Sequence, residues 1–483
     1  MMFDLVIKGG RVATPAGSFE ADVGVRGGRI TALAEDLSAE DVIDARGHLV
    51  LPGGIEAHCH IAQESASGLM TADDYRTGSA SAALGGNSSF VPFAAQHKGM
   101  GIGETLALYD SRADGQSVID YSYHLIVADP TEAALAELPV AFARGVTSFK
   151  VFMTYDRMRI DDRQFLDILS VARAHGALTM VHAENHGMIG WMTDRLLAGG
   201  NSAPRYHAIS HPALAEEEAI GRAIALSKLV DAPLFIVHVS TPEGAALLRS
   251  AQEQGARVFG ETCPQYLFLT RDDLDRGMEG AKFMCSPPLR DEATQEALWR
   301  HIRLGTFAAV SSDHAPYRYD ASGKLSGGAG ASFKGIANGM PGIAFRLPLL
   351  FSEGVVAGRI TLEQFVALSA GTVAELYGLG RKGRIAIGAD ADLAIWDPTA
   401  ERHLTLADAG DAMDYTPYEG RAVTGWPVTV LSRGVRVVEG GSVVAPAGHG
   451  QFIARVPAGL GAQPGHRAAE ADPAQNFGAE ILP

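Results

Sequence analysis

Two histidines two residues apart, His58 and His60, end an apolar stretch that reads IEAHCH over residues 55–60. On a β-strand, side chains at i and i+2 point to the same side, so both imidazoles face one way and Cys59 faces the other. Neutral imidazole is a common ligand of Zn²⁺ and similar divalent ions. A lone histidine is more often a packing residue than a ligand, so the pair by itself leaves both interpretations open.

Other apolar runs end in residues that could also bind metal, namely His182 in VHAEN, His238 in VHVS, Asp313 in SSDH and Lys150 in SFKVF. An uncompensated ammonium inside an apolar strand is costly. Lys150 is therefore either paired with an acid or carboxylated by carbon dioxide, which gives an anionic carbamate able to bridge two cations. Six such residues at the ends of these runs make coincidence a poor explanation, and they indicate a metal centre.

These candidate ligands need elements that bring them together. Between residues 53 and 375, eight short apolar runs end in polar residues, and most are separated by helical stretches such as TEAALAELPVAFARG. The runs are GGIEAHCH, SSFVPFAA, YSYHLIVAD, VTSFKVFMTY, ALTMVHAEN, PLFIVHVS, ARVFGETC and FAAVSSDHAP. Buried parallel strands that alternate with helices eight times predict an α/β fold, a (β/α)8 TIM-like barrel. The active site of such a barrel lies at the carboxyl ends of its strands, where the candidate ligands stand.

The two ends of the chain show a different pattern. Residues 1–52 and 376–447 contain short runs of alternating polarity broken by Gly-Gly turns, which is typical of β-hairpins. We predict that these segments form one small β-sandwich domain that closes around the barrel of residues 53–375. Residues 448–483 are rich in Pro, Gly and Ala and predict an extended tail, either loose or packed along a neighbouring subunit.

Composition excludes several classes of partner. The 483 residues carry a formal net charge of −16, which argues against a nucleic-acid or anionic-membrane partner. Only three cysteines occur, so no disulfide framework is implied and a reducing cytoplasm is expected. The first residues lack the basic start and apolar core of a signal peptide, and no window reaches the ~18 apolar residues of a membrane span.

The motifs HCH, SFKVFMTY, VHAEN, VHVS and SSDHAP, together with MCSPPLR and GIANGMPGI, resemble the cyclic-amidohydrolase group of the amidohydrolase superfamily, most closely the dihydropyrimidinases and hydantoinases. The likeness runs from the first strands to about residue 445. It implies two divalent ions, zinc by default, and a homotetramer. By this resemblance, His58, His60 and Asp313 hold one ion and His182 and His238 hold the other, and carboxylated Lys150 (N6-carboxylysine) bridges them together with a hydroxide.

The resemblance also assigns roles to residues around the metals. Asp313 is expected to take a proton from the hydroxide and pass it to the leaving nitrogen, and Tyr155 to stabilise the oxyanion. Tyr155 could instead be a loop aromatic that covers the barrel mouth. Ser286 and Asn338 match positions that grip the amide edge of the substrate through backbone groups, although SPP and NG could equally be turns. Four other histidines are interpreted as packing or supporting residues: His97, His124, His186 and His314.

Three departures from the family pattern put the substrate in doubt. Typical hydantoinases place bulky residues after the histidine pair, whereas this chain has IAQESASGLM. Relatives that open dihydroorotate carry an arginine two residues after the second histidine, and the Ile61 and Ala62 that follow His60 here argue against that activity. The segment after Tyr155 is about one residue short, and Ala344 stands near a position where an acid is expected. We expect all three departures to lie in loops that shape or support the substrate pocket and to leave the metal chemistry intact.

The function that follows is the opening of the ring amide of a small cyclic substrate, a 5,6-dihydropyrimidine or a hydantoin, by metal-bridged hydroxide. An allantoinase or a cyclic-imide hydrolase with the same mechanism is the alternative. A non-catalytic structural tetramer of the same fold is a further alternative, which the presence of all six metal positions and Tyr155 disfavours.

Overall fold

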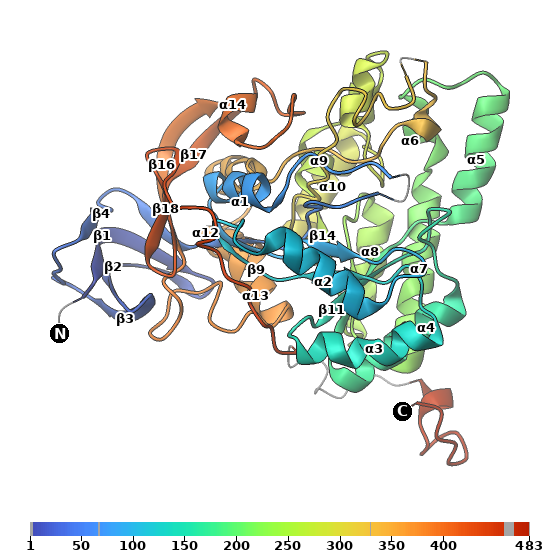
Figure 1. Ribbon diagram of the computed structural model, residues 1–483, viewed down its shortest axis with the longest axis horizontal. Coiled ribbons are helices and arrows are strands. Elements are labelled where there is room, and N and C mark those ends of the chain that lie inside the picture. The colour runs from blue at the N-terminus through green and yellow to red at the C-terminus, as the bar shows by residue number, and fades with distance from the viewer. Residues whose placement is uncertain (1–2, 66–67, 329, 458–467, 483) are drawn as a thin grey trace.

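The computed structural model describes residues 3–65, 68–328, 330–457 and 468–482, which form a barrel with a separate sheet domain beside it (Figure 1). Among the helices in these ranges, none is long and apolar enough to cross a bilayer.

Each of the eight predicted runs contains strand structure. The barrel strands form a seven-stranded parallel sheet in the order β15-β14-β13-β12-β11-β10-β8 and a three-stranded sheet in the order β6-β7-β9. Their bounds are β6 Gly54–Glu56, β7 Asn87–Phe90, β8 Phe93–Ala95, β9 Asp120–Tyr121, β10 His124–Ile126, β11 Ser148–Phe152, β12 Leu178–His182, β13 Leu234–Ile236, β14 Val258–Thr262 and β15 Ala309–Val310.

Two of the runs are split into two strands, β7/β8 and β9/β10, and Pro92, which has no N–H to give to a ladder, lies at the first break. The backbone after β6 closes the barrel, because His60 N donates to His314 O (2.8 Å) and Phe93 N donates to Cys59 O (3.1 Å). The predicted (β/α)8 barrel is confirmed.

Helices cover the outside of the barrel, and several of them have side-chain caps. In α4, Asp161 and Gln164 form a capping box at the start, and Gly176 ends the helix in the left-handed conformation. The helices are α1 Tyr75–Leu84, α2 Ile102–Ala113, α3 Glu132–Ala143, α4 Asp162–His175, α5 His186–Ala198, α6 Tyr206–Ser210, α7 Ala213–Val230, α8 Pro242–Glu253, α9 Pro264–Phe268, α10 Glu292–Arg303, α11 Arg346–Leu350, α12 Leu362–Val366, α13 Thr372–Leu376 and α14 Leu406–Ala409. Short 3-10 and π segments are η1 Arg271–Leu274, η2 Glu279–Phe283, η3 Phe333–Gly335, η4 Phe351–Val356, η5 Ala367–Gly371 and η7 Ala469–Ala471.

The sheet domain joins the two ends of the chain, as predicted. Its nine strands follow the order β19-β18-β17-β16-β5-β1-β2-β3, with β4 paired to β1, and β5 meets β16 at Val50 and Ile395. Buried side chains such as Ile7 and Leu431 give this domain a hydrophobic core of its own. The strands are β1 Leu5–Thr14, β2 Gly17–Arg26, β3 Arg29–Ala34, β4 Val42–Asp44, β5 Leu49–Pro52, β16 Leu393–His403, β17 Ala422–Ser432, β18 Val435–Glu439 and β19 Ser442–Val443.

The first part of the predicted tail lies against the barrel of its own chain. Ile453 N donates to Tyr121 O (2.6 Å), and the buried Arg455 guanidinium donates to the hydroxyls of Ser122 and Ser148 (both 2.9 Å). This segment therefore covers the barrel end from which β9 and β11 start. Residues 458–467 and 483 of the predicted tail lie outside the described residues.

Candidate metal centre and active site

All nine residues predicted for the site line one cavity of about 490 Å³. Because parallel strands end at the same side of a barrel, runs far apart in the sequence deliver their last side chains to this place. These residues are His58, His60, Lys150, Tyr155, His182, His238, Ser286, Asp313 and Asn338.

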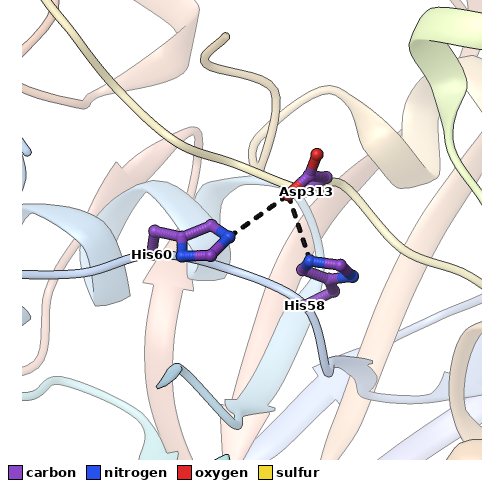
Figure 2. Close-up of side chains that lie close together, drawn as sticks. All are labelled: His58, His60 and Asp313. Atoms are coloured by element: carbon purple, nitrogen blue, oxygen red, sulfur yellow. Dashed lines mark ion pairs between the residues drawn. The ribbon is translucent and has the colours of Figure 1, made fainter. Parts of the chain in front are cut away.

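Three of them, His58, His60 and Asp313, offer ligand atoms that all lie within 4.8 Å of one another. Figure 2 shows both rings turned toward the carboxylate, with Asp313 Oδ1 3.1 Å from His58 Nε2 and 3.3 Å from His60 Nε2. His58 Nε2 has no hydrogen-bond partner among the described residues, so it meets Asp313 without being aligned to donate to it. Atoms that converge in this way suit a shared cation.

The second pair, His182 and His238, lies beside this group. Their ring centroids are 4.5 Å apart, and His238 is 5.4 Å from His58. His182 Nε2 is hydrogen-bonded to Glu184 (2.7 Å), and His238 Nδ1 is buried with no partner in the described chain. Two imidazoles need a further donor to complete a metal site, and Lys150 on the neighbouring β11 lines the same cavity.

Lys150 is almost fully buried, and its ammonium lies 5.0 Å from the centre of the Phe93 ring and 5.2 Å from that of Phe152. Burial lowers the pKa of Lys150 to about 8, partly offset by Asp313 and Glu261. A lower pKa enlarges the fraction of neutral amine, the form that reacts with carbon dioxide. The surroundings therefore favour the loss of the positive charge at this position.

The protonation states of the site fit a metal-ligand role. Burial lowers the pKa of His182 and holds that of His238 well below its ordinary value, which keeps both rings neutral. Burial raises the pKa of Asp313, but His58 and His60 outweigh it and leave that pKa well below its usual range. Neutral imidazole nitrogens and an ionised carboxylate are the donors that divalent zinc takes.

Two carboxylates behind the ligands were missed by sequence reasoning. Glu261 contacts His58 Nδ1 in a short hydrogen bond, and Glu184 holds His182. Burial lowers the pKa of His58, but Glu261 and Asp313 together outweigh it and raise that pKa, so His58 is a stronger base. Such partners fix the orientation of metal-binding histidines. The signal was present, because Glu261 ends one of the eight runs, ARVFGETC.

Tyr155 follows β11 with a positive φ of 73° and faces the metal-ligand residues. Its ring lies 5.2 Å from that of His182, and its hydroxyl is hydrogen-bonded to Ser286. Burial raises the pKa of the phenol, so Tyr155 keeps its proton and remains a hydrogen-bond donor. Asn338 Oδ1 is buried and has no partner among the described residues.

Two of the other histidines near strand ends, His124 and His314, are hydrogen-bonded to protein groups. His124 Nδ1 is 2.5 Å from Ser148 Oγ. His314 Nε2 donates to Asp73 (2.9 Å), and its Nδ1 accepts from Gly342 N (3.1 Å). Asp73, His314 and Asp411 also bring ligand atoms within 4.8 Å of one another, but both His314 nitrogens are already bound. We interpret this second cluster as a hydrogen-bond network.

The departures from the family pattern fall in different places. Ile61 is fully buried against Gly78, and Ala344 is buried against Gly85, so neither lines the cavity. Ile61 and Ala344 therefore do not form the wall of the pocket, whereas Gln63 and Ser65, in the same segment as Ile61, do. Residues 156–158 of the shortened segment do line it. Side chains that follow a strand end point inward or outward according to loop conformation, which the sequence did not reveal.

Comparison with known proteins agrees with this fold and site. Residues 49–437 match the model of the amidohydrolase family. The D-hydantoinase of Ralstonia pickettii is 42% identical over 94% of this chain and 99% of its own. A crystal structure of dihydropyrimidinase from Brevibacillus agri superposes with a TM-score of 0.91 at 41% identity, covering 94% of this chain and 98% of that one. The L-hydantoinase (dihydropyrimidinase) structure from Arthrobacter aurescens has a TM-score of 0.86 at 30% identity, covering 94% and 100%.

A barrel with converging histidines and an aspartate at the carboxyl ends of its strands defines a metal-dependent hydrolase. The chain belongs to the amidohydrolase family. The predicted resemblance to the hydantoinase and dihydropyrimidinase group and the prediction of a cyclic amidohydrolase are confirmed.

Proposed function

We propose that this enzyme opens the ring amide of 5,6-dihydropyrimidines or hydantoins. The observation that carries the proposal is that all nine residues assigned from sequence line a single cavity, with the ligand atoms of His58, His60 and Asp313 converging inside it. Relatives over nearly the whole chain are named D-hydantoinase and dihydropyrimidinase.

In this proposal His58, His60 and Asp313 would hold one divalent ion, and His182 and His238 would hold the other. The neutral amine of Lys150 would attack carbon dioxide and lose a proton, and the resulting anionic carbamate, in place of a buried cation, would help to hold both ions. When bound, two such ions supply a hydroxide at neutral pH by lowering the pKa of a shared water. Zinc suits the nitrogen and oxygen donors of the site.

The remaining steps of the proposed reaction are assigned to groups of the protein itself. Asp313 accepts a proton as the carbonyl is attacked and delivers it to the ring nitrogen as the C–N bond breaks. Tyr155, protonated and beside His182, donates a hydrogen bond to the oxyanion that develops on the carbonyl oxygen. Backbone groups of Ser286 and Asn338 hold the amide edge of the ring.

The walls of the cavity indicate what the ring can carry. Apolar side chains that include Phe152, Met158 and Ile336 line it, and they suit an apolar substituent. Arg157 and Lys334 also line it but are exposed side chains. Ala62, at the position where relatives that open dihydroorotate carry an arginine, does not line the cavity. A substrate carboxylate therefore lacks a buried, fixed partner.

The test is a ring-opening assay run side by side on dihydrouracil, hydantoin, 5-substituted hydantoins, succinimide, allantoin and dihydroorotate. We expect turnover of the dihydropyrimidine or hydantoin rings and negligible turnover of dihydroorotate. If dihydroorotate were the best substrate of the panel, the assignment would be wrong.

We further propose that the enzyme is a cytoplasmic homotetramer. The family resemblance supports the tetramer, and large apolar side chains exposed on neighbouring helices are compatible with association. Trp191 on α5 is 55% exposed, and Leu214 on α7 is 64% exposed. The three cysteines are all free and buried, which fits a reducing compartment.

A further inference from the structure

Lys324, in the loop that follows β15, is a fully buried lysine that the catalytic scheme does not use. Its ammonium donates to Ala337 O (2.7 Å) and to Met284 O (3.0 Å). Burial lowers the pKa of Lys324 to about 7, and within the described part of the chain no carboxylate pairs with it. A buried ammonium that faces only neutral carbonyls is costly, so its position calls for an explanation.

The two carbonyls belong to the segments assigned to substrate binding. Met284 lies two residues before Ser286, and Ala337 directly precedes Asn338. Met284 O also accepts from Gly339 N (2.9 Å), so the two segments are joined to each other next to the lysine. Ser286 and Asn338 both line the cavity.

The place where Gly339 is hydrogen-bonded to Met284 is tightly packed against Ala315, two residues after Asp313. Gly339 has a φ of +140°, and a Cβ atom there would lie 2.6 Å from the carbonyl oxygen of Ala315. Any side chain at this position would push the segment away. The spacing between the substrate-binding segments and the acid–base residue therefore depends on contacts of a few ångströms.

The loop that carries Lys324 is itself anchored. Lys324 N donates to Arg318 O (2.8 Å), and the Arg318 guanidinium donates to Ala412 O (2.8 Å) in the connection between β16 and β17. Gly323 fits closely, because a Cβ there would lie 2.4 Å from Arg318 O. A rigid loop thus holds the ammonium between the two carbonyls.

We propose that Lys324 is a positioning residue that fixes the separation of the 284–286 and 337–339 segments and thereby sets the affinity for the amide edge of the substrate. The proposal rests on the substrate-binding roles proposed for Ser286 and Asn338. Lys324 acts through the backbone and does not contact the substrate itself.

Kinetics of Lys324→Met give the first test, since methionine keeps the apolar length and removes both hydrogen bonds. Because both hydrogen bonds that hold the two segments together are lost, KM for a ring substrate should rise about tenfold or more. The value of kcat should change less than about threefold, and metal content should stay at the wild-type level. Lys324→Gln, which keeps two N–H donors, should recover part of the affinity and serves if the methionine variant does not fold. The control is Lys228→Met, because Lys228 lies on α7, where it is hydrogen-bonded to Gln254, and does not line the cavity.

Hydrogen–deuterium exchange of the substrate-free enzyme gives the second test and needs no activity. Exchange should increase together in peptides that span 283–287 and 336–341 in Lys324→Met, and not in Lys228→Met. Unchanged exchange in both peptides, or an unchanged KM, would overturn the proposal, as would a loss of metal with KM unaltered. Failure of the wild-type enzyme on every ring in the panel would instead refute the proposed function, while the exchange experiment would still decide the role of Lys324.

Discussion

In the proposed mechanism Asp313 has two tasks, holding a metal ion and moving a proton, and a single substitution would separate them. In Asp313→Asn the amide oxygen still offers a donor beside His58 and His60, but it cannot accept the proton. Loss of a general acid–base lowers turnover by ~10²–10⁴-fold, so we expect kcat to fall by that factor while most of the metal remains. Steady-state kinetics with metal analysis of the same sample checks this, and a near-normal kcat would remove Asp313 from proton transfer.

Glu261 contacts the proposed metal ligand His58, and substituting Glu261 tests whether this contact strengthens metal binding. Glutamine at this position keeps the size but not the charge that faces His58 Nδ1. Losing such a partner typically weakens metal binding ~10–100-fold, and we expect this for Glu261→Gln. Competition with a chromogenic chelator measures the affinity, with Glu253→Gln at the exposed end of α8 as the matched control. Equal affinities in the two variants would show that Glu261 does not support the metal.

Among individual residues, those whose chemistry is visible in a short motif could be predicted from the sequence. A strand end with two alternating histidines, or with a lysine among apolar residues, predicts that the side chain points inward. Glu261, Glu184 and Lys324 carry no such mark, because their roles depend on a partner from another strand or loop. Only the folded chain brings Lys324 to Met284, 40 positions earlier.

Among the elements, the strand ends that carry His58 and Asp313 are held from behind by a buried ion pair. Arg346 Nε lies 2.9 Å from Glu56 Oε2, and Glu56 accepts hydrogen bonds from His58 N (2.9 Å) and Ser312 N (3.2 Å). Arg346 also donates to Val310 O (2.9 Å) at the end of β15. This pair therefore connects β6, β15 and α11.

Arg346→Met leaves the Glu56 carboxylate buried without its partner. Removing one member of a buried pair costs ~3–5 kcal/mol, so the urea midpoint of unfolding should fall clearly. The double variant Glu56→Gln/Arg346→Met removes both charges and should recover a large part of this loss. If Arg346→Met were as stable as the wild type, the pair would not hold these strands.

The barrel pattern could be predicted because each buried strand is a short apolar run of its own. The sequence could not predict the breaks between β7 and β8 and between β9 and β10, because each of these two runs looks continuous in the sequence. The sequence also could not show which loop side chains line the pocket, and Ile61 and Ala344 prove to be buried in the core instead.

For the whole molecule, we expect four chains of 50.8 kDa to associate. Apolar side chains as exposed as Trp191 and Leu214 are stabilised when another subunit covers them. Light scattering at micromolar concentration should give about four times the chain mass. A monomer under those conditions would contradict the assembly. The composition of the tail predicted a segment that is either loose or packed along a neighbouring subunit, whereas Arg455 in its first part lies against the barrel of its own chain.

The central claim is that ring opening depends on divalent metal held by the six ligands and on carboxylated Lys150. The most direct measurement is hydantoin or dihydrouracil turnover by the wild-type enzyme after removal of metal with a chelator and reconstitution. We predict that the metal-free enzyme is inactive and that activity returns only when Zn²⁺ and bicarbonate are both supplied, in step with two bound ions per chain. Full turnover by the chelated enzyme, or reconstitution of Lys150→Ala to wild-type activity, would contradict this account.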